Sequence, residues 1–209
     1  MTVPEAVQAA VLLIGALLAL GRVARHWRAA GEQEQPALFC ALIGFALAAA
    51  FAAVSGVASL SSADLDAAEG WLARATYQLG IPLAALAVLA FARDWRWSRP
   101  TWGRLVLGLC VLFEVARQLG LGPAYALAVP LASAALMLYA AWVRPDAGTA
   151  RLSGVVAGIL LLISAPFPGN PLANASVLLL GLACLPLALQ LTRLEPSGGA
   201  DEKSANQGL

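Results

Sequence analysis

Three ionisable residues lie inside long apolar stretches of the sequence, and they are the first candidates for chemistry. Glu114 and Arg117 share one apolar stretch, and Arg74 lies in the preceding one. A charge inside a bilayer is costly, so such residues usually serve a function. Because Glu114 and Arg117 are three residues apart, they are expected on one face of a helix.

Polar neighbours enlarge this set. Tyr77 and Gln78 follow Arg74 at helical spacing, and Gln118 follows Arg117. If the helices around residues 74 and 114 pack together, they form one cluster with a formal charge of +1: Arg74, Tyr77, Gln78, Glu114, Arg117 and Gln118. Arginine binds carboxylate and phosphate groups through two parallel hydrogen bonds, so the cluster predicts a site for a small anionic or polar ligand. The alternative is structural: Glu114 neutralises the arginines, and Arg74 extends to the headgroups.

The sequence lacks the common catalytic and cofactor motifs. His26 is the only histidine, which excludes the intramembrane histidine pairs that bind haem. Neither HExxH nor GxSxG occurs, and those motifs mark zinc proteases and serine hydrolases. Cys40, Cys110 and Cys184 are far apart in apolar runs, which is typical of structural cysteines. We predict no cofactor and no metal, and a non-catalytic function is favoured over an enzyme.

Composition places these residues in a membrane protein. The chain is 60% hydrophobic and 12% charged, whereas soluble domains carry about 25% charged residues. Lipid offers no hydrogen-bonding partners to the backbone, so spanning segments with this pattern must be helices. The expected fold is therefore an all-α integral membrane protein with the lipid bilayer as its main partner. The net charge of +1 gives no reason to expect a nucleic-acid partner.

Seven apolar runs approach the ~20 residues that a spanning helix requires. They form one transmembrane domain over residues 1–194, and the polar stretch 195–209 is expected to be a disordered tail. The connection over residues 164–174 contains three prolines and is interpreted as a rigid connector, with a cap over a site as the alternative. The seven predicted spans are residues 5–22, 37–60, 71–92, 103–120, 123–143, 151–166 and 173–193.

The charges between the runs predict the orientation. Eleven of the thirteen basic residues follow the first, third, fifth and seventh runs, whereas the second connection holds Asp64, Asp66 and Glu69 and no base. Basic residues collect on the cytoplasmic side, so the N-terminus is predicted outside and the C-terminus in the cytoplasm. No basic residue precedes the first run, which argues against a signal peptide. Twelve arginines against the single Lys203, with abundant alanine and leucine, indicate a GC-rich bacterial genome and hence the bacterial inner membrane.

Two patterns predict how the helices associate. Residues 81–84 read Ile-Pro-Leu-Ala and residues 185–188 read Leu-Pro-Leu-Ala, which suits three-plus-one-plus-three parallel repeats of the kind that transporters use. Pairs of small residues four apart, Gly44 with Ala48 and Gly154 with Gly158, predict close helix contacts within the chain.

Three function hypotheses follow from these observations. The first is a small-solute carrier or binding protein that uses the polar cluster, which residue counting along the helices places in the outer half of the bilayer. The second is a non-catalytic subunit or assembly factor with a membrane-protein partner, since no active-site motif is found. The third is an intramembrane enzyme that acts on a lipid, and it has the least support because general acid–base catalysis usually needs two groups at close range.

Overall fold

The computed structural model describes residues 4–61, 64–143, 148–165 and 173–193. Within these ranges the chain is helical and contains no strand, which confirms the predicted all-α class. The predicted tail 195–209 and most of the proline-rich connection lie outside the described residues, as do Arg144 and Lys203.

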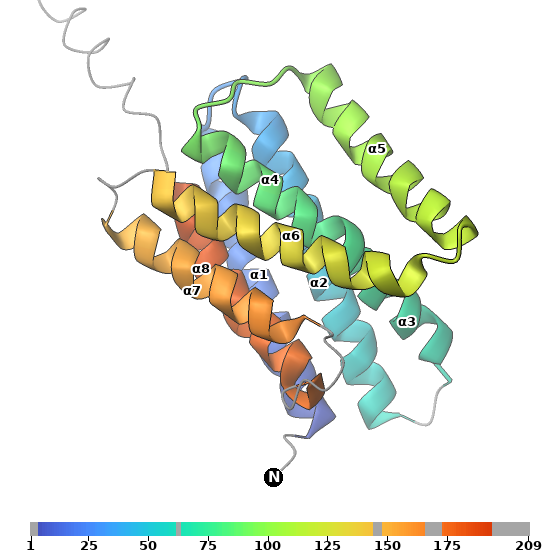
Figure 1. Ribbon diagram of the computed structural model, residues 1–209. Coiled ribbons are helices and arrows are strands. Elements are labelled where there is room, and N and C mark those ends of the chain that lie inside the picture. The colour runs from blue at the N-terminus through green and yellow to red at the C-terminus, as the bar shows by residue number, and fades with distance from the viewer. Residues whose placement is uncertain (1–3, 62–63, 144–147, 166–172, 194–209) are drawn as a thin grey trace, which may run out of the picture.

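Each predicted apolar run is helical over nearly all of its described residues (Figure 1). The third run is one continuous rod in which a π-helical turn, η1, joins α3 to α4, so the segment Asp66–Ala92 acts as a single long helix. The elements are α1 (Glu5–Ala29), α2 (Gln35–Leu60), α3 (Asp66–Ala75), η1 (Thr76–Gly80), α4 (Ile81–Ala92), α5 (Arg99–Gln118), α6 (Gly122–Val143), α7 (Gly148–Ser164), the 3₁₀ turn η2 (Ala173–Ala175) and α8 (Ser176–Arg193).

Five of these rods are long and apolar enough to cross a membrane: α1, α2, Asp66–Ala92, α6 and α8. This supports a membrane protein that crosses the bilayer several times. Helix α7 is apolar but has only 17 residues. Helix α5 has 20 residues, but Arg99, Arg104, Glu114 and Arg117 lower its hydropathy.

The helix ends differ from the ends of the apolar runs because helix formation does not stop where hydropathy falls. Helix α1 continues past Arg22 to Ala29, since arginine is a good helix former. The third rod begins earlier than predicted, at Asp66, with Asp66 and Glu69 in its first turn, where carboxylates favour the positive end of the helix dipole. Helix α5 begins at Arg99, and Pro100 occupies its first turn, a position that proline favours.

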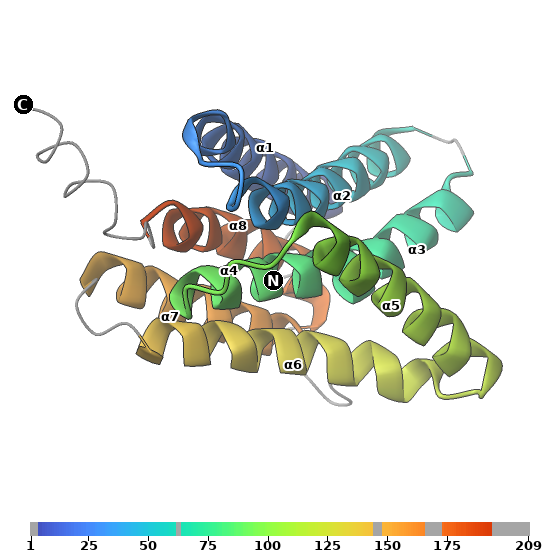
Figure 2. The ribbon, with the colours of Figure 1, turned by 90° about the horizontal axis from the view of Figure 1, so that it is seen from above.

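Six rods close a ring, and α5 lies outside it. Around the ring, α1 packs on α2, α2 on the α3–η1–α4 rod, α4 on α6, α6 on α7, α7 on α8, and α8 returns to α1. Each rod of the ring packs on its neighbours in the chain, an order with which the three-plus-one-plus-three hypothesis is compatible. Figures 1 and 2 show α5 at the edge of the molecule, where it contacts α2, η1 and α6.

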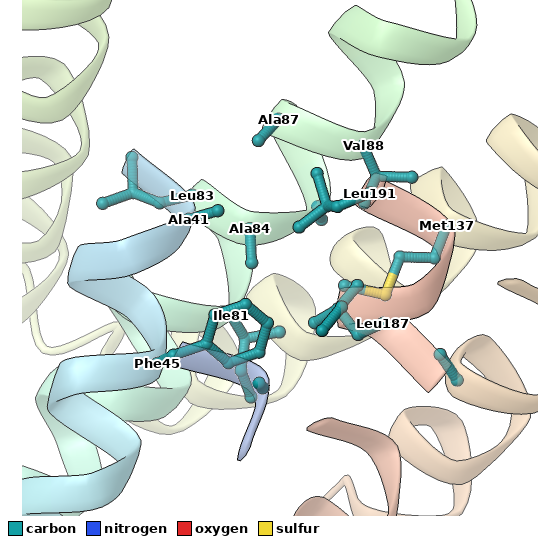
Figure 3. Close-up of a cluster of buried hydrophobic side chains, with 14 of the residues drawn as sticks. Ala41, Phe45, Ile81, Leu83, Ala84, Ala87, Val88, Met137, Leu187 and Leu191 are labelled. Carbon is teal, nitrogen blue, oxygen red and sulfur yellow. The ribbon is translucent and has the colours of Figure 1, made fainter. Parts of the chain in front are cut away.

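Helix α4 lies at the centre of the packing. Every residue of α4 except Leu86 is buried. Figure 3 shows its side chains meeting Phe45 of α2, Met137 of α6 and Leu187 of α8. The interior therefore holds a tightly packed apolar core, and the cavities that could bind a ligand lie towards α5.

Glycines allow the backbones to approach closely at two seams. A Cβ atom on Gly15 of α1 would lie 2.4 Å from the carbonyl oxygen of Gly181 of α8, and one on Gly44 of α2 would lie 2.5 Å from that of Gly80. Gly154 similarly packs against the amide of Gln190. The predicted use of Gly44 and Gly154 for contacts within the chain is confirmed.

Candidate ligand-binding site

A cavity of about 440 Å³ lies between α2, the α3–η1 segment and α5. This volume falls in the range of roughly 300–1,000 Å³ that small-molecule sites occupy. Four of the six predicted residues line it, namely Arg74 and Gln78 from the third rod and Glu114 and Arg117 from α5. The third and fourth apolar runs therefore contact each other, as the predicted cluster requires.

Glu114 and Arg117 form a closed pair on α5. The Nε and Nη2 atoms of Arg117 donate to the two carboxylate oxygens of Glu114 at 2.9 and 2.7 Å, and Gln118 donates to the same carboxylate at 3.0 Å. The side chains are 63% exposed at Arg117 and 43% at Glu114. Because each charge neutralises the other, this pair adds little net field to the cavity.

Arg74 supplies the remaining positive charge. Its Nε atom donates to the carbonyl oxygen of Gly70, one turn earlier on α3, at 3.0 Å. Within the described ranges no carboxylate pairs with Arg74. Glu114 therefore does not neutralise Arg74, and the residues that line the cavity keep a formal charge of +1. Arg74 is exposed, as its extension to the headgroups in the structural alternative would also require.

Gln78 lies four residues after Arg74 on the same wall. Its side chain is buried, at 8% exposure, and no hydrogen bond reaches its amide oxygen in the described part of the chain. A buried polar atom without a partner costs about 1–3 kcal/mol. A ligand that carries a hydrogen-bond donor would remove this cost.

The π turn explains why Tyr77 does not join the cavity. Bonds in a π turn close over five residues instead of four, so the chain winds more loosely. Gln78 then lies above Arg74, while Tyr77 turns away from this face. The Tyr77 side chain packs against the core near Ser176 and Cys184 of α8.

Gln118 also differs from the prediction. It is exposed and binds Glu114 from outside, and it does not line the cavity. The apolar residues that line the cavity were not predicted from the sequence. On α5, helical spacing from Glu114 could have indicated them. The apolar lining residues are Leu47, Trp71, Ala75, Leu79, Leu109 and Phe113, together with Cys110.

A second and larger cavity, of about 720 Å³, lies between α1, α2 and α5. It meets the first at Cys110, which lines both. Trp102, at 3% exposure, is buried beside this cavity, although tryptophans near the ends of spanning helices usually lie at the membrane interface. Trp71 and Trp142 are well exposed, at 65% and 72%, as interfacial tryptophans are expected to be.

No metal centre accompanies these cavities in the described ranges, where no three His, Cys, Asp or Glu side chains gather to hold an ion. No protein-family model, curated protein or solved structure matches the chain.

Proposed function

We propose that this protein is a small-solute carrier or binding protein of the bacterial inner membrane that binds an anionic solute beside Arg74. The observation that supports this best is the combination of an arginine without a carboxylate partner and a buried glutamine without a hydrogen bond on the wall of one cavity. A carboxylate or phosphate with a nearby hydroxyl or amine would satisfy both side chains.

The proposal includes seven spans, with the N-terminus outside. The five long apolar rods account for five crossings. In this topology α7 crosses with little tilt or with local thinning of the bilayer. Helix α5 crosses because its outer charges pair with each other and Arg99 and Arg104 stay at its inner end, close to water. Basic residues then gather at the ends of α1, α4 and α8, on the cytoplasmic side.

The order in which the helices pack supports a transport function. Two groups of three rods give a ring whose seams, α1 against α8 and α4 against α6, separate the two halves. Alternating access in transporters proceeds by movement of one repeat against the other. The proposed carrier would use these seams, with the cavity at Arg74 as the outer binding site.

A binding measurement tests the proposal with inorganic phosphate and succinate as probes. Purified protein in detergent is titrated with each anion by isothermal calorimetry. We expect Arg74→Gln to weaken binding of the preferred anion by about tenfold or more, the usual effect of losing a hydrogen bond to a charged group. The matched control is Arg104→Gln, an exposed arginine on α5 that lines neither cavity.

The Gln78→Leu variant tests whether the Gln78 side chain binds the ligand or only supports the fold. Replacing a buried polar group that has no partner by an apolar one should leave the melting temperature of the empty protein unchanged or higher, while anion binding weakens. Equal binding by wild type, Arg74→Gln and Gln78→Leu would refute the proposed site. A protein partner that co-purifies at fixed stoichiometry, without anion binding, would instead favour the subunit hypothesis.

A further inference from the structure

The larger cavity between α1, α2 and α5 is a separate site at the opposite end of α5 from Arg74. We propose that it binds a phospholipid with an anionic headgroup, held by its phosphate at Arg99 and by an acyl chain along α5. This inference depends on the protein lying in a membrane, but it does not depend on the proposed solute site.

Three residues that line the cavity carry hydrogen-bond donors without acceptors. Arg99 is exposed, lines the cavity and has no hydrogen bond or ion pair to any described residue. The rings of Trp27 and Trp102 also line the cavity, and both indole N–H groups are buried without a partner in the described ranges. Indole nitrogen and guanidinium only donate hydrogen bonds. A phosphate, which only accepts in its ionised form, is the complementary group.

The remaining walls suit a hydrocarbon chain. Most of the other lining residues are apolar, among them Ile43 on α2 and Val106 on α5. Phe39 and Leu107 line the cavity and are also 55% and 65% exposed. The mouth therefore lies on the apolar outer surface of the helices, which in a bilayer faces lipid. A lipid could enter sideways from the membrane without passing through water.

The loose packing of α5 explains why the cavity exists. On α5 only Trp102 and Ala116 are buried, so this helix touches the ring at few points. Gly103 lines the cavity, and a Cβ atom there would meet no atom within 4 Å. The space is therefore open to a larger side chain, which makes it possible to fill the cavity by substitution.

The experiment counts lipids on purified, delipidated protein by native mass spectrometry. The protein in detergent is titrated with dioleoyl phosphatidylglycerol, with dioleoyl phosphatidylcholine, or with glycerol phosphate as the headgroup alone. We expect wild type to bind one phosphatidylglycerol in preference to phosphatidylcholine, and to bind glycerol phosphate weakly. Arg99→Gln should reduce phosphatidylglycerol affinity by about tenfold, and Gly103→Leu should abolish binding by filling the cavity.

Two matched controls lie on the same helix. Arg104→Gln removes an exposed arginine that does not line the cavity, and Gly108→Leu adds the same side chain at another open glycine outside both cavities. Both should bind phosphatidylglycerol like wild type. Arg74→Gln should also do so, which separates this site from the solute site.

A second readout does not depend on mass spectrometry. Cys110 is the exposed cysteine of the three and lines both cavities. Bound phosphatidylglycerol should slow its alkylation by a small maleimide in wild type and not in Gly103→Leu. Equal lipid binding by wild type, Arg99→Gln and Gly103→Leu would overturn the proposal. So would glycerol phosphate binding as tightly as the whole lipid, because the acyl chain would then contribute nothing.

Discussion

At the residue scale, the charge at Glu114 is expected to tune the proposed solute site. Its carboxylate accepts two hydrogen bonds from Arg117 and one from Gln118. Glu114→Gln would raise the formal charge of the cavity from +1 to +2, since Arg74 and Arg117 would both lack a counter-charge. We expect phosphate affinity to increase by roughly threefold to tenfold at low salt and by less at high salt. Calorimetric titrations at two salt concentrations measure this difference.

Gln118→Leu is the control for Glu114→Gln. It removes one neutral donor to the same carboxylate but leaves the Glu114–Arg117 pair and the cavity wall intact. Phosphate affinity should therefore stay close to that of wild type. If Glu114→Gln instead lost phosphate binding, the carboxylate would be part of the site and Arg74 would not be its main anion contact.

The same residues show what spacing alone could predict. Glu114 and Arg117 share a regular α-helix, so counting residues placed both of them on one cavity wall. Tyr77 lies across a π turn, and that local change in winding leaves no clear mark in the sequence. The Trp102 ring contacts the ring of Trp97, at 5.4 Å between centroids, but its burial also depends on how α5 packs against α2, a long-range contact that no local pattern encodes.

At the element scale, the contact between α1 and α8 depends on two glycines. Gly15→Ala would place a methyl group 2.4 Å from the carbonyl oxygen of Gly181, and backbone atoms cannot move away as a flexible side chain would. Overpacking of this kind costs about 1–3 kcal/mol, which exceeds the roughly 1 kcal/mol that alanine adds to helix stability over glycine. We expect a lower melting temperature, measured by tryptophan fluorescence in detergent.

Gly21→Ala is the matched control on the same helix, because a Cβ atom there meets no atom within 4 Å. It should keep the melting temperature or raise it slightly. A Gly15→Ala variant as stable as Gly21→Ala would mean that α1 and α8 are further apart than the structure shows.

The hydropathy of the sequence predicted the positions of the helices well, because both lipid and a packed helical core favour apolar residues. It located their ends poorly, as α1 shows, since a helix continues into water as long as its residues favour the helix. Helix α5 shows the other limit. Its charges made it appear as a functional span in the sequence, but its position outside the ring follows from packing between distant segments.

At the scale of the whole molecule, the two similar four-residue segments of the sequence can be placed in the ring of helices. Residues 81–84 open α4 and residues 185–188 lie within α8, and these two helices contact each other while each belongs to its own group of three rods. Four matching letters in alanine- and leucine-rich helices carry little information by themselves. The contacts of α1 with α8 and of α4 with α6 are compatible with two groups of three rods, because such repeats would exchange these two contacts.

The proposed topology predicts which helix ends face each side of the membrane. Single cysteines at four exposed positions, Ser59, Ser98, Leu119 and Thr149, are placed in a Cys110→Ala background and treated in intact cells with a membrane-impermeant maleimide. Seven spans predict labelling at positions 59 and 119 and protection at 98 and 149 until the cells are permeabilised. Protection of both 98 and 119 in intact cells would mean that α5 lies along the inner surface without crossing. In that case its charged end could not form an outer binding site, and the solute proposal would fail together with the topology.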